Sequence, residues 1–164
     1  MDRRQIGTKL TLDAIGVELS LGTFHDRLIV QKTIYLAQAA GINLGYFFHW
    51  YLRGPYCSDL TGDVFAMSRE LVAGSTDAEG WALDSASRQR ATRLAGLFPT
   101  GDAGNRADTL ELLASVHFLI DHRQDARDDT RALHATLERY HKDYSLEETT
   151  AARQRLLDHG LIVE

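Results

Sequence analysis

The chain of 164 residues contains one cysteine, Cys57, and only two prolines, Pro55 and Pro99. A single cysteine excludes an intrachain disulfide and any cysteine-based zinc site within one chain. Neither proline lies in a low-complexity linker, and no segment rich in proline and glycine marks a domain boundary. The sequence therefore predicts one domain over residues 1–164.

Long hydrophobic runs are also missing. The longest one is far too short to cross a bilayer, and the first residues are not followed by a signal-type hydrophobic region. Together with the lone cysteine, these features predict a cytoplasmic protein that does not contact a membrane. The net charge of −5 argues mildly against general affinity for nucleic acid, and the cluster of Arg88, Arg90 and Arg93 is typical of a solvated helix face.

The usual catalytic signatures are absent as well. The chain has no glycine-rich phosphate-binding loop, no dinucleotide-binding fingerprint and no nucleophile elbow around a serine. A dispersed active site leaves no such local pattern, so an enzyme stays possible but is the less favoured interpretation. We expect no cofactor.

Apolar residues at helical spacing are abundant, and capping signals accompany them. We expect Asp26 to cap the second helix, Gly41 to end it, and capping boxes to open helices at Asp108–Glu111 and Ser145–Glu148. The fold class is mainly α, a single compact domain of six or seven helices with one or two short strands and C-terminal helices over 107–160. The helices expected from these patterns cover about 9–19, 26–40, 58–71, 84–98, 108–120, 128–144 and 145–160.

An aromatic segment interrupts the helices. The density of aromatic residues in Tyr46–Leu52 favours a strand covered on both faces. The next four residues, Arg53–Tyr56, predict a tight turn, because glycine is conformationally free and proline fixes φ. Ser58 is then placed to cap a new helix, and Trp81 with Leu83 can form a second strand beside the first.

The turn carries the candidate site. Arg53 can pair with Asp59 or Asp63 on the following helix and stack on Trp50 or Tyr56. These residues form either a partner-binding surface or a determinant of the fold. The second interpretation is favoured because the local backbone conformation is enough to explain the glycine, the proline and the serine. The candidate residues are Trp50, Arg53, Gly54, Pro55, Tyr56 and Asp59.

Two other groups of residues are weaker candidates. His134, Glu138 and His141 project from one side of a predicted helix and can in principle ligate a metal, but they are better explained as its solvent flank. Cys57, at the start of a helix with His49 near in sequence, lacks a readable base and orienting group for nucleophilic catalysis.

The dipeptide His25–Asp26 has the composition of a phosphohydrolase metal dyad. The other histidine and aspartate ligands of such a site are not at convincing positions. Asp26 as a helix cap explains the dipeptide more simply.

The segments Gln31–Leu36, Gly45–Tyr46 and Trp50–Leu60 resemble the bacterial YwgA-type proteins. They are also distantly similar to the Panacea antitoxin domain and the SocA-type adaptor, in which a helix of the "QKLLYL" kind leads to a strand and a "GPY" or "GPV" turn opens the next helix. The resemblance covers residues 24–72 well and the C-terminal helices only by pattern. The Arg-Gly-Pro-Tyr turn and the longer aromatic strand are closer to the YwgA type.

This resemblance implies a small, mainly helical domain that works by binding another protein. Antitoxins of this type neutralise toxins by contact, and the adaptor presents a toxin for proteolysis. The leading hypothesis is therefore a non-enzymatic protein-binding module, antitoxin-like or an accessory subunit of a toxin–antitoxin or anti-phage defence complex, whose partner is a toxin, a protease or another subunit. The alternatives are a nucleic-acid-binding accessory subunit with winged-helix-like features and an enzyme with a dispersed or metal site.

Overall fold

The structure is a computed structural model that describes residues 1–122 and 129–163. Within these residues the chain is mainly helical and forms a single compact domain with one two-stranded antiparallel sheet, which confirms the predicted fold class. The elements are α1 Arg3–Ile15, α2 Phe24–Ala39, β1 His49–Tyr51, β2 Gly54–Tyr56, α3 Ser58–Val72, α4 Ser85–Ala95, α5 Ala103–His122, α6 Thr130–Arg139 and α7 Leu146–Asp158. None of the described helices combines the length and the apolar content that a membrane-spanning segment needs.

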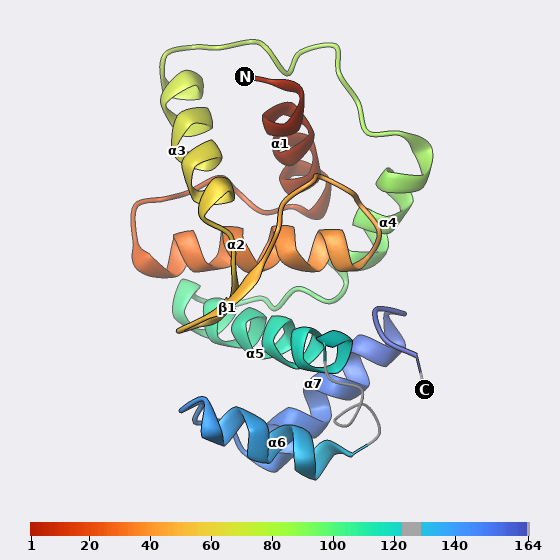
Figure 1. Ribbon diagram of the computed structural model, residues 1–164. Coiled ribbons are helices and arrows are strands. Elements are labelled where there is room, and N and C mark those ends of the chain that lie inside the picture. Colours follow the sequence, from red (N-terminus) through yellow and green to blue (C-terminus); the bar gives the residue numbers. More distant parts are fainter. Residues whose placement is uncertain (123–128, 164) are drawn as a thin grey trace.

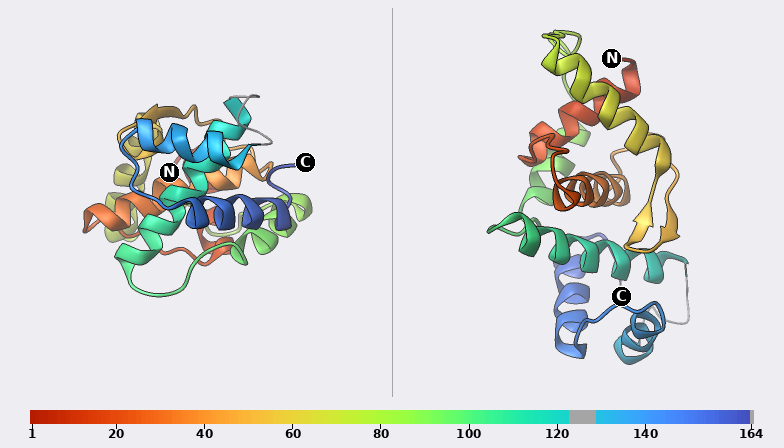
Figure 2. Two further views of the ribbon diagram at one scale, coloured as in Figure 1. Left: turned by 90° about the horizontal axis from the view of Figure 1, so that it is seen from below. Right: turned by 90° about the vertical axis from the view of Figure 1, so that its left-hand side faces the viewer.

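Helices α2 and α5 lie side by side at the centre of the domain (Figure 1). α1, α3 and α4 lie on the side of α2 away from α5, and α6 and α7 lie on the opposite side of α5, as Figure 2 shows in two further views. The β-hairpin contacts both central helices through β2. It therefore joins the N-terminal helices to the C-terminal ones.

Both N-terminal helices begin earlier than the apolar pattern predicts. Asp2 caps α1 in a capping box with Gln5, and the helix ends at Gly16, whose φ of 85° is left-handed. Gly16 is thus the C-cap and not a weak interior position of a helix over 9–19. The prediction that Asp26 caps α2 is also wrong, because Thr23 is the N-cap and Asp26 completes its capping box from the third helical position.

The predicted strand over Tyr46–Leu52 is only partly formed. β1 comprises three residues, and its first and last side chains are exposed, so it is not covered on both faces. Gly54–Tyr56, predicted as a turn, is the second strand, and the hairpin loop is Leu52 and Arg53. Trp81 and Leu83 form no strand, and Trp81 is exposed.

The C-terminal half shows one further correction. α5 begins at Ala103, so Asp108–Glu111 is not a capping box, and Glu111 is buried in the helix interior. The capping box at Ser145 is confirmed, and Asp129 caps α6, while Asp128 lies outside the described residues. The chain leaves α7 at Gly160, which has a left-handed φ of 69°.

Candidate functional site

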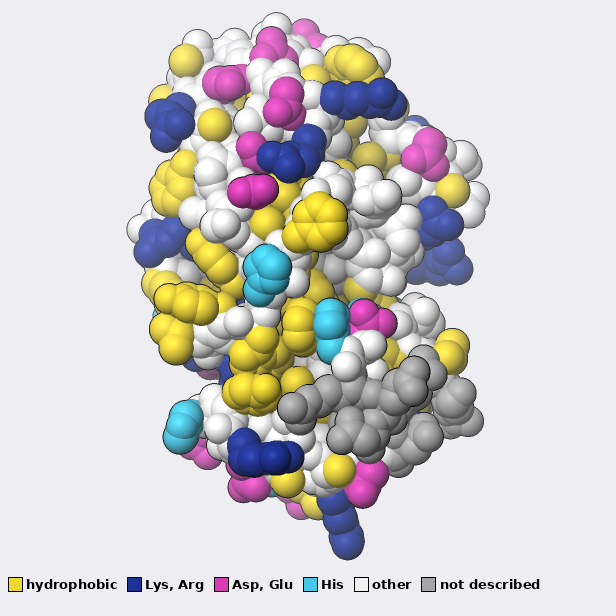
Figure 3. Space-filling view, in the orientation of Figure 1, with side chains coloured by type: hydrophobic (Ala, Val, Ile, Leu, Met, Phe, Trp, Pro, Cys, Tyr) yellow, Lys and Arg dark blue, Asp and Glu magenta, His cyan; other side chains and the backbone are white. Residues whose placement is uncertain are grey.

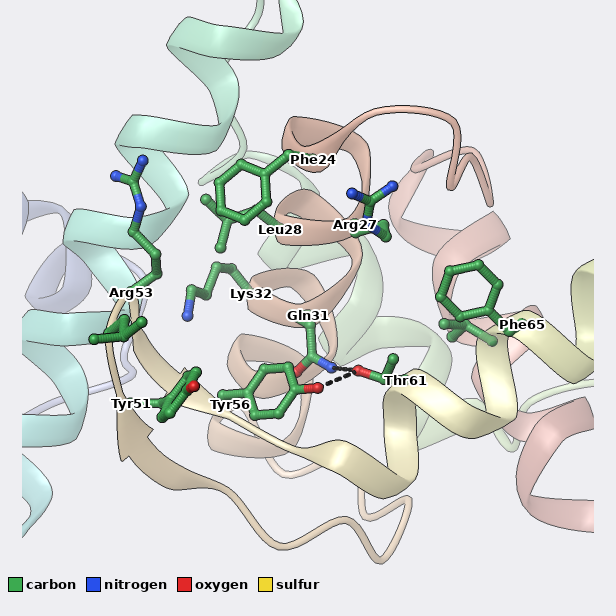
Figure 4. Close-up of a pocket in the computed structure, with 12 residues that line it drawn as sticks. Phe24, Arg27, Leu28, Gln31, Lys32, Tyr51, Arg53, Tyr56, Thr61 and Phe65 are labelled. Carbon is green, nitrogen blue, oxygen red and sulfur yellow. Dashed lines mark hydrogen bonds between the residues drawn. The ribbon is translucent and has the colours of Figure 1, made fainter.

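A cavity of about 320 Å³ opens between α2, α3 and the hairpin (Figure 4). This volume is at the lower end of the range typical of sites for small ligands. Its walls combine apolar and aromatic side chains with cations, and no aspartate or glutamate of the described residues lines it. The lining residues are Phe24, Arg27, Leu28, Gln31, Lys32, Tyr51, Leu52, Arg53, Tyr56, Thr61, Val64 and Phe65.

One face of α2 supplies five of these residues. Phe24, Arg27, Leu28, Gln31 and Lys32 follow the spacing i, i+3, i+4, i+7 and i+8, which places their side chains along one stripe of a helix. α3 contributes its own stripe across the cavity. The cavity therefore exists because two helical faces meet without filling the space between them, and the hairpin closes the remaining side.

Gln31 fixes the start of α3 against α2. Its Nε2 donates to the Cys57 carbonyl at 2.8 Å, and its Oε1 accepts from the Cys57 N–H at 3.1 Å. The same Nε2 lies 2.8 Å from Thr61 Oγ1, and Thr61 donates to the Tyr56 hydroxyl at 2.9 Å. The prediction that Ser58 caps α3 is wrong, because Cys57 is the N-cap, without a side-chain capping bond, and Ser58 is the first helical residue. Gln31 instead holds the backbone of the N-cap residue.

Lys32 is the most unusual residue of the cavity. Its side chain is almost completely buried, with 1% of its surface exposed, and it reaches from α2 toward the hairpin (Figure 4). Within the described part of the chain, the Nζ donates one hydrogen bond, to the Pro55 carbonyl at 2.6 Å. Burial lowers the pKa of Lys32 to about 7, and the nearby charges of Lys142 and Arg53 act in the same direction against the attraction of Glu111.

Glu111 is a buried carboxylate beside the hairpin. It pairs directly with Lys142, and its other oxygen accepts from Arg53 at 3.1 Å. Lys142 also donates to the Leu52 carbonyl at 3.2 Å. These bonds hold the hairpin loop to α5 and to the segment between α6 and α7.

Arg53 differs from the sequence-based prediction. It pairs with Glu111, not with Asp59 or Asp63, and its guanidinium carbon lies 5.5 Å from the centre of the Phe24 ring, not over Trp50 or Tyr56. Asp63 instead contacts Arg4, while Asp59 is exposed and lies outside the cavity lining. The correct partners of Arg53 are distant in sequence, and this explains why the local pattern did not show them.

Gly54 lets the hairpin approach α5 closely. Its φ of 80° is in the left-handed region, and a Cβ at this position would overlap the hydroxyl oxygen of Ser115. Ser115 Oγ is itself buried and has no hydrogen-bond partner in the described part of the protein. The glycine is thus required both for its backbone conformation and for space.

Trp50 lies outside the cavity. Its ring packs 4.6 Å from Tyr140 and 5.7 Å from Phe118, between centroids, and the Lys142 Nζ lies 5.7 Å from its centre. Of the six candidate residues, Arg53 and Tyr56 line the cavity, Gly54 and Pro55 support it through the backbone, and Trp50 anchors the hairpin to α5.

The weaker candidates do not converge on a site in the described ranges. His134 donates from Nε2 to the Tyr144 carbonyl at 2.8 Å, its Nδ1 is 3.8 Å from Glu138, and His141 follows the end of α6 with a φ of 56°. Residues 1–122 and 129–163 contain no group of three or more metal-ligating side chains close enough to hold an ion. Cys57 is buried, whereas His49 is exposed. The described residues show no hydrogen bond between these two side chains.

Sequence reasoning missed several residues of the cavity. Five of them, beginning at Phe24 and spaced i, i+3, i+4, i+7 and i+8, were detectable in the sequence as one stripe of a helix. The second signal was a lysine in a helix that is apolar on most of its sides, because a lysine there is expected to be buried. Glu111 was misread as a cap. The cavity residues missed include Phe24, Arg27, Gln31 and Lys32, and the buried ion pair of Glu111 and Lys142 beside the hairpin was missed as well.

Comparisons with models of protein families, with curated proteins and with solved structures find no match.

Proposed function

We propose that this protein is a non-enzymatic protein-binding module that holds a partner protein against the hairpin and the rim of the cavity. The observation that carries the proposal is a group of large apolar side chains left exposed there: Phe24 (49%), Tyr51 (59%), Leu52 (77%) and Phe65 (39%). Hydrophobic side chains also gather over the hairpin region in Figure 3. Contiguous exposed apolar surface of this kind marks interaction sites.

The class of partner that we propose rests on the resemblance of residues 24–72 to YwgA-type proteins and the Panacea antitoxin domain. We propose a toxin, a protease or another subunit of a bacterial toxin–antitoxin or anti-phage defence complex. In this proposal the protein acts as an antitoxin-like or accessory subunit. The hairpin tip is suited to contact because Lys142, paired with Glu111, bonds the Leu52 carbonyl, while the side chains of Tyr51 and Leu52 keep much of their surface exposed.

Co-purification with tagged protein from the native host tests the proposal. The wild-type protein is expected to bring down one partner protein at stoichiometric levels, and the double variant Tyr51→Ser/Leu52→Ser is expected to lose it. Val72→Ser is the matched control, because Val72 is 87% exposed but lies at the far end of α3, outside the cavity lining. Absence of a stoichiometric partner, or retention of the partner by the double variant, contradicts the proposal.

A further inference from the structure

The lining of the cavity has an unusual charge. Among the residues that the structure describes, three of those that line it, Arg27, Lys32 and Arg53, are cationic and none is acidic, although the chain as a whole has a net charge of −5. Glu111, whose charge acts on Lys32, is not among the residues that line the cavity and is engaged by Lys142 and Arg53. The cavity is thus a locally positive site in an acidic protein.

Lys32 has hydrogen-bonding capacity left over. An ammonium group has three N–H donors, and in the described residues only the Pro55 carbonyl accepts from this one. A buried cation without a directly bonded anion costs free energy, and the low pKa of Lys32 reflects that cost. An anion entering the cavity would supply the missing counter-charge and additional acceptors.

The uncharged residues that line the cavity indicate the size and the apolar character of the rest of the ligand. Phe24, Leu28, Val64 and Phe65 line one part of the cavity, and Tyr51 adds a further aromatic ring. A volume of about 320 Å³ accommodates a compact organic molecule and not a folded polypeptide segment. The apolar walls disfavour a fully hydrated ion such as free phosphate, because its water shell would gain few polar replacements there.

We infer that this cavity is a binding site for a small organic acid, in which the carboxylate is held by Lys32, Arg27 and Arg53 add positive charge to the lining, and an aromatic or aliphatic body lies against the phenylalanine walls. The site does not depend on a protein partner, since every residue named belongs to this chain. The ligand is a monoanion with one charged end and one apolar end.

A matched set of probes tests the charge requirement. The purified protein is titrated with 3-phenylpropionate, the neutral 3-phenylpropanamide and the cationic 3-phenylpropylamine, with hexanoate as an aliphatic acid, and binding is followed by NMR chemical shifts of backbone amides. We expect at least one acid to shift the signals of residues around Lys32 and to bind about tenfold or more tightly than the amide, with no binding of the amine. Equal binding of acid and amide, no binding of either acid up to millimolar concentration, or shifts confined to another surface overturns the inference.

Variants locate the site. Lys32→Met keeps an unbranched side chain of nearly the same length and removes its charge, and it is expected to weaken acid binding tenfold or more, whereas Arg27→Gln is expected to weaken it a few-fold. Arg69→Gln is the control, because Arg69 lies on α3 outside the lining and loses the same charge. Acid binding that is unchanged in both Lys32→Met and Arg27→Gln overturns the inference, and the result is independent of whether the hairpin rim holds a partner protein.

Discussion

Two buried lysines donate to backbone carbonyls of the same hairpin, and they have different surroundings. Lys142 is 5% exposed, bonds directly to Glu111 and donates to the Leu52 carbonyl. Lys32 is 1% exposed, donates to the Pro55 carbonyl and has no carboxylate in direct contact within the described residues. Burial lowers the pKa of both ammonium groups, and contact with Glu111 offsets part of this effect for Lys142.

The difference separates Lys142, a structural cation held in an ion pair, from Lys32, a receptive cation that is available to an anionic ligand. A buried ion pair loses much stability when one partner is removed, because the other charge stays buried and unpaired. A buried cation without a bonded anion instead lowers the stability of the folded protein. Such groups are concentrated at functional sites.

The largest expected effect is at Lys142. Lys142→Met leaves Glu111 buried with only the half-exposed Arg53 as a partner, and we expect it to lower the free energy of unfolding by about 3 kcal/mol or more at pH 7. Lys32→Met removes an unpaired charge at the loss of one hydrogen bond, so we expect a decrease of no more than about 1 kcal/mol, or an increase. Urea unfolding of the two variants provides the comparison, and equal destabilisation would show that the two lysines have the same role.

The next effect concerns Gly54, the first residue of the strand whose Pro55 carbonyl accepts from Lys32. Gly54→Ala introduces a Cβ against Ser115 at a left-handed φ, and we expect it to lower the free energy of unfolding by about 2 kcal/mol or more. Ser115→Ala removes the hydroxyl that the new methyl group meets. Thermal unfolding of the two single variants and the double variant should show partial rescue, and strictly additive effects would contradict a direct clash.

Lys32 also predicts a pH dependence. Its pKa is about 7 in the folded protein and 10.5 ordinarily, so the unfolded chain binds more protons between these values and stability rises with pH from 7 toward 10. The expected rise is on the order of 3 kcal/mol, with a smaller share from Lys142 in the same direction. Urea unfolding between pH 7 and 9.5 should show this rise for the wild type and a much flatter profile for Lys32→Met; parallel profiles would argue against it.

The smallest effect is expected at Arg53. Arg53→Ala removes a half-exposed guanidinium from Glu111, which keeps Lys142, so we expect a loss of about 1 kcal/mol or less. Binding of an organic acid should weaken a few-fold in the same variant. A loss of stability as large as that of Lys142→Met would show that Arg53 is the main partner of Glu111.

Local sequence patterns predicted most of the fold. Apolar spacing and capping residues such as Ser145 and Gly41 identified the helices, because these signals act within one turn of the chain. They failed where a residue had a distant partner. Glu111 has the composition of a capping residue, but its role is set by Lys142, 31 positions away.

The candidate site was only half predictable for the same reason. The Arg-Gly-Pro-Tyr segment was predicted as a turn, yet Gly54–Tyr56 is a strand because it pairs with His49–Tyr51 and packs on α5. The cavity itself arises from the meeting of α2 with α3, which no single segment encodes. The sequence signal for the cavity was the stripe on α2 that begins at Phe24. This stripe is recognised only when its charged residues are counted together with its apolar ones.

The most direct test is a measurement of the pKa of the Lys32 ammonium by NMR, with and without bound 3-phenylpropionate. In the free protein we expect a pKa of about 7, and in the complex a rise toward the ordinary value of 10.5, because the carboxylate stabilises the charged form. A pKa near 10.5 in the free protein, or one that does not change when the acid is bound, would contradict the assignment of Lys32 as the receptive cation of this cavity.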